Sequence, residues 1–262
     1  MDALGTAFGN ELAKILWRAK YRVMIVIYAA AGLCSGLFGA SGFGVRLLRE
    51  FIYNVTGSNV VYGALSLYRS LLLPLAIFML AADSFAHELE TKSIKCVLTR
   101  PIGRFEAYLA KCLAILCYVA FALGTGFAAV QAWQVVSAAV AGGAAAPLSA
   151  GAPAVAEAFA AYALTLVPMA AFVAFATFIS VVFRSPALVM FVCIALYCAF
   201  SVIGILYNGA GAALFTAYTG WYRMWLGERL PWRSLAASAG LLLSTCVAFF
   251  GFGFFIFEKK DI

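Results

Sequence analysis

Long apolar stretches dominate this sequence, and each is about as long as a lipid bilayer is thick. An α-helix needs about 20 apolar residues to cross the roughly 30 Å of hydrocarbon in a bilayer. Because a backbone that crosses hydrocarbon must satisfy its own hydrogen bonds, we expect each stretch to be a helix. The six stretches of this length are Val23–Val45, Ser66–Phe85, Phe105–Val140, Val155–Phe183, Pro186–Tyr207 and Ser234–Phe257.

The composition indicates that lipid is part of the solvent around this chain. Hydrophobic residues make up 65% of it and charged residues 11%, whereas soluble domains have about 45–50% and about 25%. A single globule of 262 residues has too little interior to bury that much apolar surface. We therefore predict an all-α integral membrane protein with six transmembrane helices, in which residues 1–262 form a single transmembrane domain.

The basic residues between the stretches predict the orientation. With the N-terminus inside, twelve Lys and Arg lie on the inner side and six on the outer side. Positive residues concentrate in cytoplasmic loops, so we expect both termini in the cytoplasm. The same rule, together with attraction to anionic membrane lipid, accounts for the formal net charge of +7 without a nucleic-acid partner.

Two segments outside the spans carry amphipathic or aromatic patterns. Residues 1–22 have apolar side chains at helical spacing and a separate basic stripe, which predicts an amphipathic helix in the membrane interface; the alternative is the polar start of the first span. Residues 208–233 are rich in aromatic side chains, which favour the headgroup level, so we predict an extracytoplasmic re-entrant segment. The residues concerned are Phe8, Leu12, Ile15, Leu16, Lys14, Arg18 and Arg22 in the first segment, and Tyr218, Trp221, Tyr222, Trp225 and Trp232 in the second.

Several residues inside the spans also carry structural expectations. Pro74 and Pro168 each remove a backbone donor and should bend their helices. Gly32 and Gly36 form a small-residue pair of the kind that lets helices approach closely. Arg69 and Asp83 bracket a short apolar stretch, and we expect both side chains to extend to opposite interfaces.

The connection between the second and third spans has an ordered charge pattern. Acidic residues come first and basic residues follow. The apolar side chains between the basic residues predict a short amphipathic helix with one apolar face. Arg100-Pro101 ends that helix, because the residue before proline avoids the α conformation. An ordinary positive-inside loop would account for the charge, but not for this order. The residues in chain order are Asp83, Glu88, Glu90, Lys92, Ile94, Lys95, Val97, Leu98, Arg100 and Arg104.

This connection resembles the first cytoplasmic loop of ABC-2-type ABC transporter permeases. The match consists of an acidic residue, an apolar run, a Thr-Arg-Pro, a further Arg and a Lys in the next helix. The sequence departs from the family pattern at Lys92-Ser93, where relatives have Gly-Thr. The C-terminal residues 257–262 are also similar. The matching positions are Glu88, Ile94, Val97, Leu98, Thr99, Arg100, Pro101, Arg104 and Lys111.

The resemblance implies that residues 86–104 form a cytoplasmic coupling segment that docks on a separate ABC ATPase. Two permease copies, identical or homologous, would work with two ATPase copies in a bacterial cytoplasmic (inner) membrane. In this arrangement Glu88 orients the loop and the remaining candidate residues contact the ATPase. The apolar contacts would be Ile94, Val97 and Leu98, and the polar contacts Lys95, Arg100 and Arg104.

No residue pattern indicates catalysis by this chain. It has no G-x-x-x-x-G-K-[ST] phosphate-binding loop, so ATP and Mg²⁺ would bind the partner ATPase. The seven cysteines are scattered and His87 is the sole histidine, which disfavours a metal site. The sequence therefore predicts the permease of an ATP-driven exporter, with a lipid-like or peptide cargo. The alternatives are an ion-coupled secondary transporter or channel, which needs ionisable groups at mid-membrane, and a non-transporting membrane assembly factor.

Overall fold

The computed structural model describes residues 3–41, 60–90, 103–140, 151–206, 214–225 and 231–260. These residues are helical almost throughout and include no strand, which confirms the predicted all-α class. The elements are α1 (Ala3–Trp17), α2 (Ala19–Ser41), α4 (Val60–Leu67), the π-helix η1 (Tyr68–Leu72), α5 (Leu73–Ala81), the π-helix η2 (Ala82–Ala86), α6 (His87–Glu90), α8 (Arg104–Val140), α9 (Gly151–Leu164), α10 (Leu166–Val182), α11 (Pro186–Leu206), the 3₁₀ helix η4 (Phe215–Met224) and α13 (Trp232–Lys259).

Five helical segments among the described residues are long and apolar enough to cross a membrane. They match the second to sixth predicted spans, and they are Val61–Ala86, Arg104–Ser137, Pro153–Val182, Pro186–Gly204 and Trp232–Lys259. Helix α2 covers the first predicted span as far as Ser41. Residues 42–45 lie outside the described part, so the count of six crossings stays a prediction.

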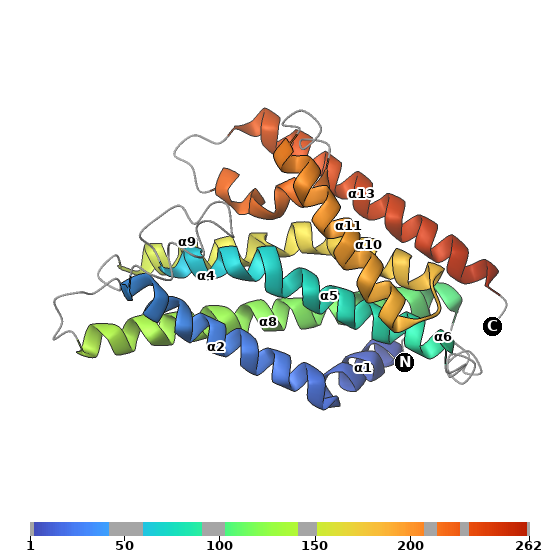
Figure 1. Cartoon of the computed structure of the whole chain (residues 1–262), viewed down its shortest axis with the longest axis horizontal. Coiled ribbons are helices and arrows are strands. Elements are labelled where there is room, and N and C mark those ends of the chain that lie inside the picture. The colour runs from blue at the N-terminus through green and yellow to red at the C-terminus, as the bar shows by residue number, and fades with distance from the viewer. Residues whose placement is uncertain are drawn as a thin grey trace.

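The helices run roughly along one axis, and both termini lie at the same end of the bundle (Figure 1). We call this end, where α1, α6 and the start of α8 also meet, the termini end. Helix α10 packs against α13, α5 and α8, while α2 and α1 both pack along α8. Helices α11 and α13 bury few of their residues. Their outward side chains are large and apolar, as a lipid-facing surface requires; they include Phe191, Leu206, Leu243, Val247 and Phe252.

The N-terminal segment is two helices rather than the single helix predicted over residues 1–22. Helix α1 ends at Trp17 and α2 begins at Ala19, with the backbone carbonyl of Arg18 accepting hydrogen bonds from Tyr21 and Arg22. The basic stripe of Lys14, Arg18 and Arg22 is therefore divided between two helices. The side chains that α1 buries are Ala7, Glu11 and Ile15, whereas Leu16 is exposed.

The two prolines coincide with interruptions of their helices, as predicted. Pro74 follows the π-helix η1 by two residues, and it has no N–H to donate to the carbonyl of Ser70 four residues earlier. The hydroxyl of Tyr197 on α11 donates to that carbonyl at 2.6 Å instead. Pro168 lies three residues after Thr165, which separates α9 from α10.

Close helix contact at Gly32 agrees with its place in the small-residue pair. A Cβ atom at Gly32 would lie 2.6 Å from the hydroxyl of Tyr68 and 3.1 Å from the carbonyl oxygen of Gly126. The absence of a side chain thus lets α2 approach both α8 and the second span. The surroundings of Gly36 lie outside the described part of the chain.

Candidate functional site

Four charged side chains at the termini end form what we call the buried ion cluster: Glu11, Glu88 and Lys111, which are buried, and Lys14, which is exposed. The Lys111 ammonium donates to Glu88 Oε2 at 2.7 Å and to Glu11 Oε2 at 3.1 Å. The Lys14 ammonium donates to Glu11 Oε1 at 2.7 Å and to Glu88 Oε1 at 3.4 Å. Each carboxylate thus binds both lysines, and the cluster has no net formal charge.

The contribution of these ion pairs to stability depends on how deeply the charges are buried. Lys111 is 1% exposed, and Glu11 and Glu88 are also buried. Removing such ions from water costs several kcal/mol each, and good ion-pair geometry with further hydrogen bonds is needed to offset that cost. Burial alone would raise the pKa of Glu11, but the charges of Lys111 and Lys14 hold that pKa below its ordinary value. Burial alone would lower the pKa of Lys14, but hydrogen bonding to Glu11 and the charge of Glu88 raise it.

The buried ion cluster joins three elements that are distant in the sequence. Glu11 and Lys14 lie on α1, Glu88 on α6 at the end of the second span, and Lys111 one to two turns into α8. Residues 91–102, which include most of the predicted coupling segment, connect α6 to α8. The Glu88–Lys111 contact therefore holds together the two helices from which that segment emerges, and it fixes α1 against both.

A second group of charges surrounds Asp83. Its carboxylate accepts a hydrogen bond from Tyr21 and forms ion pairs with Lys20 and, at 3.6 Å, with Arg18. These three partners lie at the break between α1 and α2 or in the first turn of α2. Asp83 thus holds that break against the second span, and its charge is balanced by these partners.

A serine inserted into the second span shapes the backbone between Asp83 and Glu88. The Ser180 hydroxyl, on α10, donates to the carbonyl of Ala81 at 2.7 Å and accepts from the backbone N–H of Ala86 at 3.2 Å. A side chain that enters a helix in this way explains the widened π turn of η2. The inserted serine therefore sets the direction in which Asp83 and Glu88 leave the helix.

The start of α8 also contacts the end of the chain. The guanidinium of Arg104 donates to the backbone carbonyl of Glu258 in the last turn of α13, and the Lys260 ammonium donates to the carbonyl of Val181 near the end of α10. Cations at helix C-termini satisfy carbonyl groups that have no partner in the helix and interact well with the helix dipole. Arg104 thus ties the far end of the predicted coupling segment to α13.

The structure describes two of the seven residues predicted to contact the ATPase. Glu88 and Arg104 flank residues 91–102 and both make the contacts given above. The other five, Ile94, Lys95, Val97, Leu98 and Arg100, lie outside the described residues. Sequence reasoning missed Glu11, the partner of Lys111. Its signal was an acidic residue three positions before Lys14 on the otherwise apolar face of α1.

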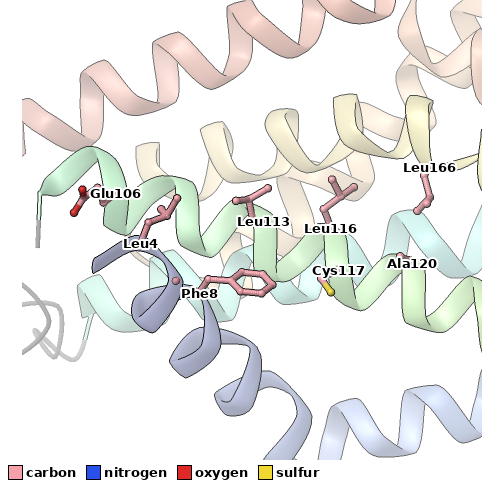
Figure 2. Close-up of a pocket in the computed structure, with 9 residues that line it drawn as sticks. Leu4, Phe8, Glu106, Leu113, Leu116, Cys117, Ala120 and Leu166 are labelled. Atoms are coloured by element: carbon pink, nitrogen blue, oxygen red, sulfur yellow. The ribbon is translucent and has the colours of Figure 1, made fainter. Parts of the chain in front are cut away.

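An apolar groove lies between α1 and α8 (Figure 2). Its volume is about 820 Å³. Figure 2 shows Leu4 and Phe8 of α1 facing a row of side chains on α8. Glu106 is the one charged residue of the lining, and it lies at one end. The lining residues are Leu4, Gly5, Phe8, Glu106, Leu113, Leu116, Cys117, Ala120 and Leu166.

Comparison with known protein families identifies the family of this chain. The family model described as ABC-2 family transporter protein matches residues 52–262, which contain every element from α4 to α13, whereas α1 and α2 precede the match. No curated protein matches the chain. The matched region includes the five segments long and apolar enough to cross a bilayer. Since the family model spans most of the sequence, this chain belongs to the ABC-2 family of transporter proteins and is a multi-pass membrane permease of an ABC transporter.

Proposed function

We propose that this chain is the membrane-spanning subunit of an ATP-driven exporter in a bacterial cytoplasmic membrane, with α2 as the first of six crossings and both termini in the cytoplasm. A separate ABC ATPase would hydrolyse ATP with Mg²⁺, and this chain would hold no nucleotide and catalyse no reaction itself. One observation beyond family membership carries the proposal. The buried ion cluster ties both helices that flank residues 91–102 to α1.

In this proposal, residues 86–104 couple ATP hydrolysis by the partner to movement of the permease helices. A helix within residues 86–104 docks on the ATPase through Ile94, Val97 and Leu98, with Lys95 and Arg100 as polar contacts. When ATP closes the ATPase pair, the segment moves as its docking groove moves. Buried ion pairs resist separation because an unpaired buried charge is costly. The displacement therefore passes through Glu88 and Arg104 to α1, α8 and α13 as a unit.

The apolar groove supports a lipid-like or peptide cargo with a long apolar part. It opens beside α1, which in this proposal lies in the membrane interface. Its lining contains a single charge, Glu106, at one end. An amphipathic molecule fits that arrangement, because its apolar part contacts α8 while its polar part stays at the interface. Two permeases, identical or homologous, would form the working transporter with two ATPases.

The test is purification of the full chain in detergent. We expect a soluble ATPase to copurify and its ATP hydrolysis to respond to the permease. Leu98→Asp and Arg100→Glu should each remove the ATPase from the complex, because they place a carboxylate in the docking surface. Arg233→Glu, the same charge reversal on α13, is the matched control and should leave the complex intact. A complex that survives both coupling-segment variants would refute the docking surface, and the absence of any ATPase would favour a membrane assembly factor.

A further inference from the structure

Hydrogen-bond donors without partners gather at the end of the bundle opposite the termini. Among the described residues, the buried side-chain nitrogen and oxygen atoms that lack a hydrogen-bond partner are Arg69 Nε, Tyr222 Oη and Trp225 Nε1. The guanidinium and indole N–H groups only donate, and a phenol hydroxyl can donate. Buried polar groups in proteins are nearly always paired, so each exception requires an explanation. Three orphaned donors indicate a missing acceptor.

Arg69 is the charged member of this group. It is 7% exposed and lies on η1, within the second span. Its Nη1 donates to Thr219 Oγ1 at 3.0 Å and its Nη2 lies 3.4 Å from Ser66 Oγ. The ion pairs in which both partners are described residues all involve Glu11, Asp83 or Glu88. The Arg69 guanidinium is thus covered by η4, which gives it a hydrogen bond to the neutral Thr219 hydroxyl, and its predicted extension to an interface stays a prediction.

Helix η4 contacts this cation through Thr219, and the other two donors follow at steps of three residues: Tyr222 on η4 and Trp225 at its C-cap. The backbone N–H of Trp225 donates to the Tyr222 carbonyl at 3.0 Å. Side chains three apart in a 3₁₀ helix lie above one another, so these two side chains extend from the face that contacts Arg69. Close approach of η4 depends on Gly220, where a Cβ atom would lie 2.9 Å from Arg69 Nη1.

We propose that Arg69, Tyr222 and Trp225 form a binding site for a phosphate group, as carried by the headgroup of a phospholipid. The guanidinium presents a planar fork of donors that matches the geometry of a phosphate. Arg69 is eight residues into the span that begins at Val61, which places it about 12 Å from that end of the helix at 1.5 Å per residue. Trp221 on η4 and Trp232 at the start of α13 belong to the aromatic segment of residues 208–233, and tryptophan prefers the headgroup level of a membrane.

Entry of a headgroup requires a movement of η4. Arg69 on η1 is covered by η4, which carries the other two donors, so a phosphate enters between them only when this short helix shifts away from η1. Helix η4 has a break of its own, since Gly220 has φ −90° and ψ 21° and leaves the helical conformation. This inference does not depend on the proposed ATPase partner, because it rests on donors at the opposite end of the bundle.

The test measures binding of defined probes to the full chain in detergent, by native mass spectrometry and by tryptophan fluorescence. The probes are dioctanoyl phosphatidylglycerol, dioctanoylglycerol, which lacks the phosphate, and inorganic phosphate. We expect the phosphate-bearing lipid to bind tightest. Arg69→Gln should weaken its binding roughly tenfold or more, because it removes charge-assisted hydrogen bonds. Arg233→Gln removes an exposed charge near the same end and should change nothing.

Further variants keep the outcome decisive. Tyr222→Phe and Trp225→Phe retain an aromatic ring and each remove one orphaned donor, so both should weaken binding severalfold even if Arg69→Gln fails to fold. Equal binding of inorganic phosphate would support the same site with free phosphate as its ligand. Equal binding of both lipids, or an Arg69→Gln protein that binds as the wild type does, would overturn the proposal.

Discussion

Lys111 is a charged side chain that has almost no contact with water. The energetic cost of burying its ammonium is offset by two carboxylates from different helices. Its ammonium lies between Glu11 and Glu88, and 5.8 Å from the centre of the Phe85 ring. An ion pair that is fully buried contributes little net stability compared with well-packed apolar residues, but the loss of one partner is costly because the other charges remain buried. This asymmetry predicts a specific pattern of mutant stabilities.

We expect Lys111→Met to destabilise the chain by about 3–5 kcal/mol, because it leaves two buried carboxylates with Lys14 alone. The measurement is the free energy of unfolding, or the melting temperature, in detergent. The triple variant Lys111→Met, Glu11→Gln, Glu88→Gln removes the buried charges together and should recover most of that loss. A triple variant as unstable as the single one would contradict the role given to the buried ion cluster.

The sequence identified half of this cluster. Glu88 and Lys111 belong to the pattern that resembles ABC-2 permeases, and both proved to be buried and paired. Glu11 escaped notice because it is 100 residues from Lys111 in the chain, and the pairing depends on how α1 packs against α8. The burial of Arg69 was also not predictable, since it results from the path of η4 over a helix about 150 residues earlier in the sequence.

Among the elements, the second span departs most from a regular α-helix. It contains two π-helical segments, and a side chain from another helix satisfies the backbone beside each of them. Proline at position 74 predicted the first interruption, because it removes a donor at a known position. The second interruption follows from Ser180 on α10, and no local sequence signal predicts an insertion from a distant helix.

The contact between Pro74, Ser70 and Tyr197 predicts an energetic coupling. Tyr197→Phe leaves the carbonyl of Ser70 without its donor and should destabilise the chain by about 1–2 kcal/mol. Pro74→Ala restores an N–H that can donate to the same carbonyl. The cost of Tyr197→Phe should therefore be smaller by about 1 kcal/mol in the Pro74→Ala background, as a double-mutant cycle of unfolding free energies measures. Additive costs would show that the two residues do not serve the same carbonyl.

At the scale of the whole molecule, the two ends of the bundle differ in their electrostatics. The ion pairs in which the structure describes both partners lie at the termini end, where they fix α1 to the bundle. The Glu11 carboxylate has a pKa below its ordinary value of 4.5. Its ionised form therefore contributes stability that is fully present above pH 4.5 and is lost as the pH falls through the lower pKa of the folded chain.

We expect the attachment of α1 to weaken on acidification below about pH 4.5, whereas it should be unchanged between pH 6 and pH 8. Hydrogen exchange of α1 amides, corrected for the intrinsic effect of pH, measures this release. Glu11→Gln supplies the control, because it has no carboxyl group to titrate at that position and should show a smaller change. Equal acid sensitivity of wild type and Glu11→Gln would assign the release to other groups.

The inserted hydroxyl of Ser180 limits the ways in which the second span and α10 can move. Sliding by one helical turn, about 5.4 Å, would pull the serine out of η2 and break both of its hydrogen bonds. A rotation about the serine preserves them. These hydrogen bonds thus fix the two helices at one position along their axes. Any conformational change of the bundle that preserves both bonds must rotate the helices about Ser180.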